Sequence, residues 1–120
     1  MNRIDCFDVK KEFNAADGET ILECIIHVDS SLDYFKGHFN EIALLPGVVQ
    51  LHFLNSILQK SFENYGGIGK IAVLKNLKPV IPNDTIKYVI KVKGKTVNFA
   101  IYKESLQKSL CVTEGRLSIC

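Results

Sequence analysis

Two histidines, His38 and His52, flank a Leu-Pro-Gly step in the stretch FKGHFNEIALLPGVVQLHFL, residues 35–54. Imidazole titrates near neutral pH, so a histidine held beside a substrate can accept or donate a proton. Pro46 is pre-set for the first position of a helix, where its missing N–H costs nothing. The spacing therefore predicts a helix start between two proton-transfer groups. The alternative is that two histidines happen to flank a turn.

The composition defines the kind of protein in which these groups must work. The chain has 120 residues, of which 47% are hydrophobic, so we expect one packed domain spanning residues 1–120. Lysine and arginine total 15 against 13 acidic residues, a balance that argues against nucleic acid recognition. The lysines of the C-terminal half are interpreted as a solvated sheet face, or else as a mildly basic rim for an acidic partner.

The cysteine spacing and the lengths of the apolar stretches indicate the cellular compartment in which we expect the protein. No Cys-x-x-Cys pair is present, and the spacing argues against both a zinc site and a disulfide framework. Free or buried thiols in a reducing cytosol are the simplest interpretation. The stretch MNRIDCFDVKK lacks the apolar segment of a signal peptide, and no stretch is long enough to span a bilayer. We therefore expect a cytoplasmic protein that is not bound to a membrane. The four cysteines are Cys6, Cys24, Cys111 and Cys120.

One helix and a set of strands must position the two histidines. A helix is predicted from about residue 47 to 62, and Gly115 is predicted to mark a bulge or a close backbone approach. A single helix cannot cover both faces of the sheet, so the sheet must curl around it and leave a surface for a second subunit. Strands are predicted at residues 4–13, 21–29, 69–80, 85–92, 96–103 and 109–119.

The predicted helix carries a wide apolar arc. His52 shares the remaining, polar face with Asn55, Ser56 and Gln59. The arc suits a helix largely wrapped by the sheet. Its members recur at spacings of three and four residues: Val48, Leu51, Leu54, Leu58 and Phe62.

This order of elements, with Gly-His-Phe at 37–39 and Pro-Gly-Val at 46–48, resembles the hot-dog fold. That is an α+β fold in which a curled antiparallel sheet wraps around one long central helix. Within it, the chain is similar to the 3-hydroxyacyl-(acyl carrier protein) dehydratases of fatty acid synthesis, and more closely to the small dehydratases of aryl-polyene-type pathways. A second stretch, LKPVIPND at 77–84, matches the family's Pro-Val-x-Pro-Gly-Asp run. The resemblance covers nearly the whole chain.

The chain departs from the family pattern at three places. Asn40 and Ala43 replace two prolines, and Asn83 replaces the glycine of the Pro-Gly-Asp turn. Asparagine can still adopt the left-handed conformation that such a turn requires. The acidic residue that the family places on the helix falls at His52, with its spacing intact.

The resemblance implies dehydration of a 3-hydroxyacyl thioester to the trans-2-enoyl thioester. This reaction needs a base near C2, an acid near C3 and a donor for the thioester oxygen, but no cofactor. The implied roles are His38 as base and the Gly47 N–H as donor at the helix start, with Val48 and Phe39 in the substrate site. As imidazolium, His52 would protonate the departing hydroxyl; as neutral imidazole it would orient water or substrate. The alternative for His52 is a polar helix residue with no role.

The implied partners are an acyl carrier protein that carries the substrate and a second copy of the chain, in a homodimer or higher homo-oligomer. Two other functions stay open. A hot-dog acyl thioesterase would need a carboxylate in the first helical turns, where none is present. A degenerate, non-catalytic subunit that binds acyl chains or a catalytic paralogue is motivated by Asn40, Ala43 and His52. A two-histidine metal site has only Glu41 as a nearby third ligand, so no metal is expected.

Overall fold

The computed structural model describes residues 8–28, 45, 47–105 and 108–120, and it places six strands in one antiparallel sheet with a helix against one face. The strand order across the sheet is β1-β2-β4-β5-β6-β3. The predicted order of two strands, one helix and four further strands is confirmed. The elements are β1 (Val9–Asn14), β2 (Glu19–His27), α1 (Gly47–Ser61), β3 (Ile68–Asn76), β4 (Thr85–Lys93), β5 (Thr96–Ser105) and β6 (Lys108–Ile119).

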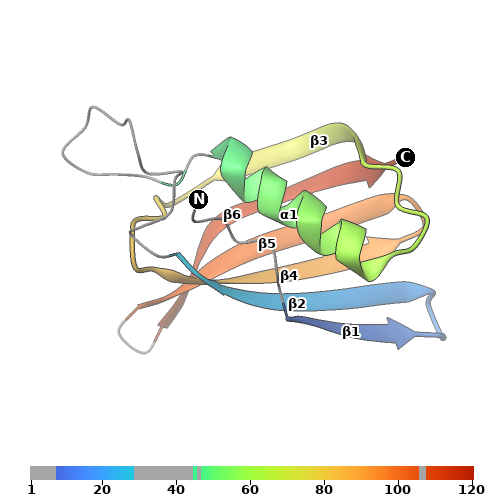
Figure 1. The fold of residues 1–120 in the computed structure, drawn as a ribbon, viewed down its shortest axis with the longest axis horizontal. Helices are drawn as coiled ribbons and strands as arrows, with labels where there is room; N and C mark the ends of the chain where they lie inside the picture. Colours follow the sequence, from blue (N-terminus) through green and yellow to red (C-terminus); the bar gives the residue numbers. More distant parts are fainter. Residues whose placement is uncertain (1–7, 29–44, 46, 106–107) are drawn as a thin grey trace.

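α1 crosses the sheet obliquely (Figure 1). Its start lies beside the end of β3, because the side chain of Asn76 borders Gly47. Its end lies beside the edge strand β1, where Lys11 Nζ donates a 2.7 Å hydrogen bond to the carbonyl oxygen of Ser61. This path leaves much of β3 outside the cover of the helix. Within the described residues, no helix is long and apolar enough to cross a membrane.

The central strands bury one face and expose the other, as their alternating sequences predict. Cys24 of β2 stands opposite Tyr88 of β4, and both side chains are buried. Glu23 and Lys87 lie on the opposite face, where their charged groups are 3.6 Å apart. Helix side chains complete the core against the inner face of the sheet. The core members from these three elements are Leu22, Cys24, Ile26, Ile86, Tyr88, Ile90, Val92, Phe53, Leu54, Ile57 and Leu58.

The buried face of the helix agrees with the predicted arc except in the first turn. Val48 was expected to begin the apolar arc, but its side chain is 73% exposed. Gln50 is buried instead, and it shares the buried face with Phe53, Leu54, Ile57 and Leu58. These positions recur at spacings of three and four, which confirms the helical period. Leu54 and Leu58 of the predicted arc are buried, and Leu51 and Phe62 pack against the core, so only Val48 departs from it. The cause is that apolar residues cover most of the circumference of α1, whereas the sheet covers only one side of it.

Two backbone predictions are confirmed by the turns and the last strand. Asn83 has a φ of 73° and therefore takes the left-handed conformation in the turn before β4. A Cβ on Gly115 would lie 2.5 Å from the carbonyl oxygen of Val73 and 2.9 Å from the ring of Phe99. Only glycine fits such a close backbone approach.

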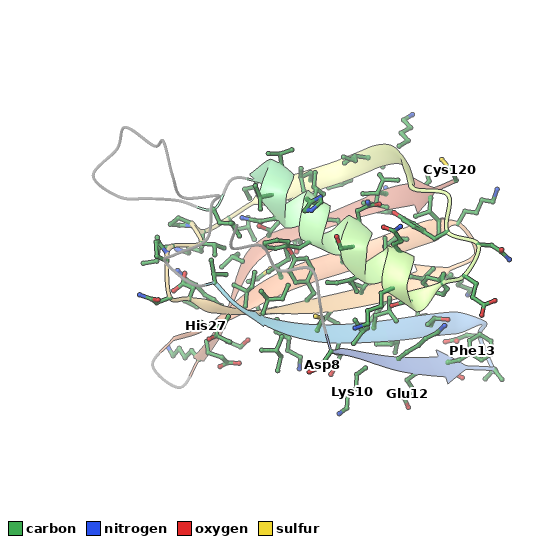
Figure 2. The ribbon with its side chains drawn as sticks, viewed as in Figure 1. Asp8, Lys10, Glu12, Phe13, His27 and Cys120 are labelled. Atoms are coloured by element: carbon green, nitrogen blue, oxygen red, sulfur yellow. The ribbon has the colours of Figure 1, made fainter. Side chains whose placement is uncertain are left out.

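The two edges of the sheet differ in chemistry. In Figure 2 the labelled side chains of Lys10 and Glu12 extend from β1 away from α1, and charged side chains on an edge strand oppose pairing with another chain. The other edge, β3, exposes Ile71 and Leu74, which are 42% and 37% accessible. β3 also exposes Lys70 and Lys75, so it differs from β1, with Lys10, Lys11 and Glu12 among six residues, in having a lower density of charge.

Candidate active site

The start of α1 presents hydrogen-bond donors that lack helical acceptors. The N–H groups of a first helical turn have no intrahelical partner, and they carry the positive end of the helix dipole. No acidic side chain stands in the first turn to neutralise that end. Gly47 adds no side chain there, so a ligand can approach the backbone closely. The predicted donor, the Gly47 N–H, is therefore in a position suited to an oxygen with developing negative charge.

A pocket of about 370 Å³ opens beside this helix start. Gly47 and Asn76 lie on its wall, and Lys78 contributes the only charge among its described lining residues. A larger pocket of about 910 Å³ lies at the opposite end of α1, around Lys11 and Tyr65. We place the site at the smaller pocket, because of these two pockets only that one adjoins the N–H groups of the first helical turn. The remaining residues of the smaller pocket are Leu45, Gln50, Leu77 and Pro79.

Gln50 lies at the centre of a buried hydrogen-bond network beneath the pocket. Its side chain is only 5% exposed, and its Nε2 donates to the carbonyl oxygen of Leu45 at 3.3 Å. The hydroxyl of Thr113 on β6 donates to Gln50 Oε1 at 2.6 Å. The phenol of Tyr88 on β4 donates to the backbone carbonyl of Gln50 at 2.7 Å. The first turn of α1 is thus tied to two strands of the sheet.

Burial extends the donating form of the Tyr88 phenol further into the alkaline range. Removal from water raises the pKa of Tyr88 well above its ordinary value of 10.0, and the nearby Cys24 thiol raises it further. Burial likewise raises the pKa of Cys24 from 9.0 to about 11. Tyr88 therefore remains a hydrogen-bond donor throughout the neutral range.

His52 lies on the outer side of α1. Its side chain is exposed, and its ring contacts that of Phe53 at a centroid distance of 6.3 Å. Five residues at 3.6 per turn separate His52 from Gly47 by about 140° around the helix axis. Val48, one turn earlier, lies on the same exposed side as His52. Within one chain, therefore, Val48 and His52 point away from the pocket at Gly47.

Of the five predicted site residues, His38 and Phe39 lie outside the described residues. The structure brings Gly47 to a pocket, and it places Val48 and His52 together on the exposed side of α1. Sequence reasoning missed Gln50, Asn76 and Thr113. One signal was available for Gln50, since it is the polar member of the otherwise apolar run VVQL at 48–51. Among the described residues, no group of three His, Cys, Asp or Glu side chains could hold a metal.

Three solved structures share the fold of this chain. An uncharacterised protein from Erwinia carotovora subsp. atroseptica is 24% identical, with a TM-score of 0.82 over 94% of this chain and 90% of that one. A chain of the dehydratase heterocomplex ApeI:P from Xenorhabdus doucetiae is 23% identical, with a TM-score of 0.71 over 92% of this chain and 94% of that one. The dehydratase domain of the polyketide PpsC from Mycobacterium tuberculosis is 12% identical, with a TM-score of 0.67 over 92% of this chain. This chain spans only 42% of that longer domain.

These matches confirm the predicted α+β hot-dog fold. No curated protein matches the chain significantly. The family model of the ApeI dehydratases, described as ApeI-like, matches residues 14–115, which is most of the chain. The protein is therefore a member of the ApeI-like dehydratase family.

Proposed function

We propose that the chain dehydrates a 3-hydroxyacyl thioester, carried by acyl carrier protein, to the trans-2-enoyl thioester in fatty acid or polyene-type biosynthesis. Membership of the ApeI-like dehydratase family supports a dehydratase. The observation that carries the proposal is the start of α1 at Gly47, which has no acidic side chain in its first turn and lies beside a pocket of about 370 Å³. A thioester oxygen placed there would meet backbone N–H donors as negative charge develops on it.

In the proposed reaction, His38 removes a proton from C2 while the Gly47 N–H stabilises the charge that moves onto the thioester oxygen. The electron pair of the former C–H bond then forms the C2–C3 double bond. The C3–O bond breaks, and the hydroxyl leaves as water with a proton from His52 in its imidazolium form. Phe39 and Val48 contact the acyl group. No redox step occurs and no co-reactant is consumed.

The proposed active unit is a homodimer or a larger homo-oligomer, in which His38 works with His52 of the partner subunit. Two observations support it. Val48 and His52 face outward from α1, so a second chain is needed to enclose them. The edge strand β3 exposes Ile71 and Leu74, which a β3-to-β3 contact would bury. Both features lie on elements that flank the pocket.

The family resemblance implies an acyl carrier protein as the carrier, and we propose that this carrier is acidic. Lys78 supports it, because this exposed lysine lies on the wall of the pocket. A positive charge at the mouth would attract an acidic partner at low ionic strength.

Product analysis tests the proposal. The purified chain is incubated with 3-hydroxyacyl carrier protein, and the acyl group is followed by intact-protein mass spectrometry. We expect loss of one water from the acyl group and retention of the thioester. Free acid together with free carrier thiol would indicate a thioesterase instead, although the first turn of α1 has no carboxylate to activate water. Failure to produce either product would contradict the proposed activity.

A non-catalytic subunit that binds a catalytic paralogue is a second candidate. The observation that favours it is His52 at the position where the family resemblance places an acid, and the ApeI:P heterocomplex gives a precedent for two different chains in a dehydratase. Substitution His52→Glu distinguishes the two candidates. Activity that appears only after this change would support the non-catalytic subunit. If the natural chain is active and the substitution leaves that activity equal or lowers it, the result would support a catalytic role for His52.

A further inference from the structure

Leu45, the described residue that precedes α1, is held at both of its backbone polar groups. Leu45 N–H donates to the carbonyl oxygen of Val80 at 2.8 Å, and the Leu45 carbonyl accepts from Gln50 Nε2 at 3.3 Å. Gln50 lies in the first turn of that helix. Its side chain therefore reaches back across the helix start and binds the carbonyl group of Leu45.

The Gln50 side chain is itself fixed from β6. The Thr113 side chain is 1% exposed, and its hydroxyl oxygen lies 2.6 Å from Gln50 Oε1 and 3.2 Å from Asn76 Oδ1. A hydroxyl has one hydrogen, which the shorter contact to Gln50 takes. Asn76 Oδ1 is a second and more distant acceptor for that hydrogen. One threonine hydroxyl thus orders two amide side chains.

These two amides border Gly47 from different sides. Gln50 holds Leu45, which precedes the helix start, whereas Asn76 lies against the Cα of Gly47 itself. Both amides also line the 370 Å³ pocket. An apolar pair of similar volume at positions 50 and 113 would fill the same space without the need to satisfy buried polar atoms. A polar pair at this point in the core needs a reason other than packing.

We propose that Gln50 and Thr113 are positioning residues that hold the Gly47 N–H in the orientation required by the substrate's thioester oxygen. This inference rests on the proposed dehydration. Neither residue reacts, and neither needs to touch the substrate. A displacement of the donor by a fraction of an ångström weakens its interaction with the transition state more than with the bound substrate.

Three variants and one control separate positioning from ordinary core stability. Thr113→Val removes the hydroxyl at nearly constant volume, and Thr113→Ser keeps it. Gln50→Leu with Thr113→Val removes both side-chain polar groups together, so that neither is left buried without the other, while the Leu45 carbonyl loses its donor. Thr20→Val is the matched control, because Thr20 is also a buried threonine but lies opposite Val92, at the far end of β2 from this network.

The positioning role predicts a division between kcat and stability. Thr113→Val should lower kcat about tenfold or more, equivalent to at least about 1.4 kcal/mol of transition-state stabilisation, with a smaller change in KM. Thr113→Ser should restore most of that loss. The Gln50→Leu/Thr113→Val double variant should recover the melting temperature but not kcat. Thr20→Val should lose stability without a comparable loss of kcat. Recovery of both quantities in the double variant would overturn the inference.

A second readout does not depend on activity. The amide resonance of Gly47 in ¹H–¹⁵N spectra, and its rate of hydrogen exchange, report the environment of that N–H directly. We expect both to change in the double variant, with no change at Gly47 in Thr20→Val. An unchanged Gly47 amide in the double variant would overturn the inference even if the wild-type chain proved to have no dehydratase activity.

Discussion

Asn76 at the end of β3 lies against Gly47 at the start of α1, so that a Cβ on Gly47 would come within 3.3 Å of the Asn76 amide nitrogen. This contact joins the exposed edge strand to the helix start. It also explains why the helix begins with glycine, since a side chain would push the amide away. The same contact lies at the wall of the candidate pocket.

Gly47→Ala is predicted to lower the dehydration rate about tenfold while leaving the fold intact, because the added methyl group displaces Asn76 and crowds the approach to the N–H. Steady-state kinetics and circular dichroism measure the two effects. The matched comparison is Gly69→Ala, whose Cβ would meet the carbonyl oxygen of Ser118 at the same 3.3 Å but away from the pocket. Equal rates for the two variants would contradict the role of Gly47.

Gly115→Ala is predicted to destabilise the protein by about 3 kcal/mol, near the upper end of the usual cost of overpacking. The Cβ would lie 2.5 Å from the backbone oxygen of Val73, which cannot rotate away as a side chain can. Urea unfolding measures the loss. Gly69→Ala again serves as the control, with a predicted cost below about 1 kcal/mol. A similar loss of stability for both variants would contradict this prediction, because it would mean that β3 and β6 can move apart at Gly115 to accommodate the methyl group.

The strands could be predicted from sequence because their period of two is local. Ile86, Tyr88 and Ile90 alternate with lysine and valine, and the structure buries those three side chains. The left-handed conformation at Asn83 could also be predicted from sequence, because asparagine tolerates positive φ.

The buried side of the first turn of α1 could not be predicted in this way. Apolar residues occupy most of its circumference, so packing against the sheet selected the side that contains Gln50 and left Val48 exposed. The partner that makes a buried Gln50 tolerable, Thr113, is 63 residues away in sequence. No local pattern joins the two. The predicted donor Gly47 lies at a pocket, whereas the role of His38 stays a prediction.

Stability is predicted to fall as the pH rises from about 9 to 11. The pKa of Cys24 is raised from 9.0 to about 11 by burial, so the unfolded chain loses this proton first and the folded state loses its advantage across that interval. Tyr88, whose pKa is also raised, acts with the same sign above 10.0. Each group contributes at most about 1.4 kcal/mol per pH unit.

Urea titrations at pH 8 and pH 10.5 measure this dependence. Cys24→Ala should flatten the decline, although it also lowers the stability at every pH by leaving a cavity. The comparison is therefore between slopes and not between levels. An identical slope in wild type and Cys24→Ala would contradict the assignment to the Cys24 thiol.

Leu74→Lys is predicted to dissociate the proposed homo-oligomer and to abolish activity, because it places a charge on the exposed edge of β3. Light scattering coupled to size-exclusion chromatography gives the mass of the species. The control is Phe13→Lys on the opposite edge strand, where Phe13 is 62% exposed. If Phe13→Lys dissociates the assembly and Leu74→Lys does not, the interface lies at β1 and the proposed sharing of sites across β3 is wrong.

The rate of dehydration by His38→Ala tests the central claim most directly. The wild-type chain and the variant are incubated with the same 3-hydroxyacyl carrier protein, and 2-enoyl thioester is measured over time, with matching melting curves as evidence of an intact fold. Removal of the base is predicted to lower the rate by about 10²–10⁴-fold. A variant that forms the enoyl product as fast as the wild type would contradict the account.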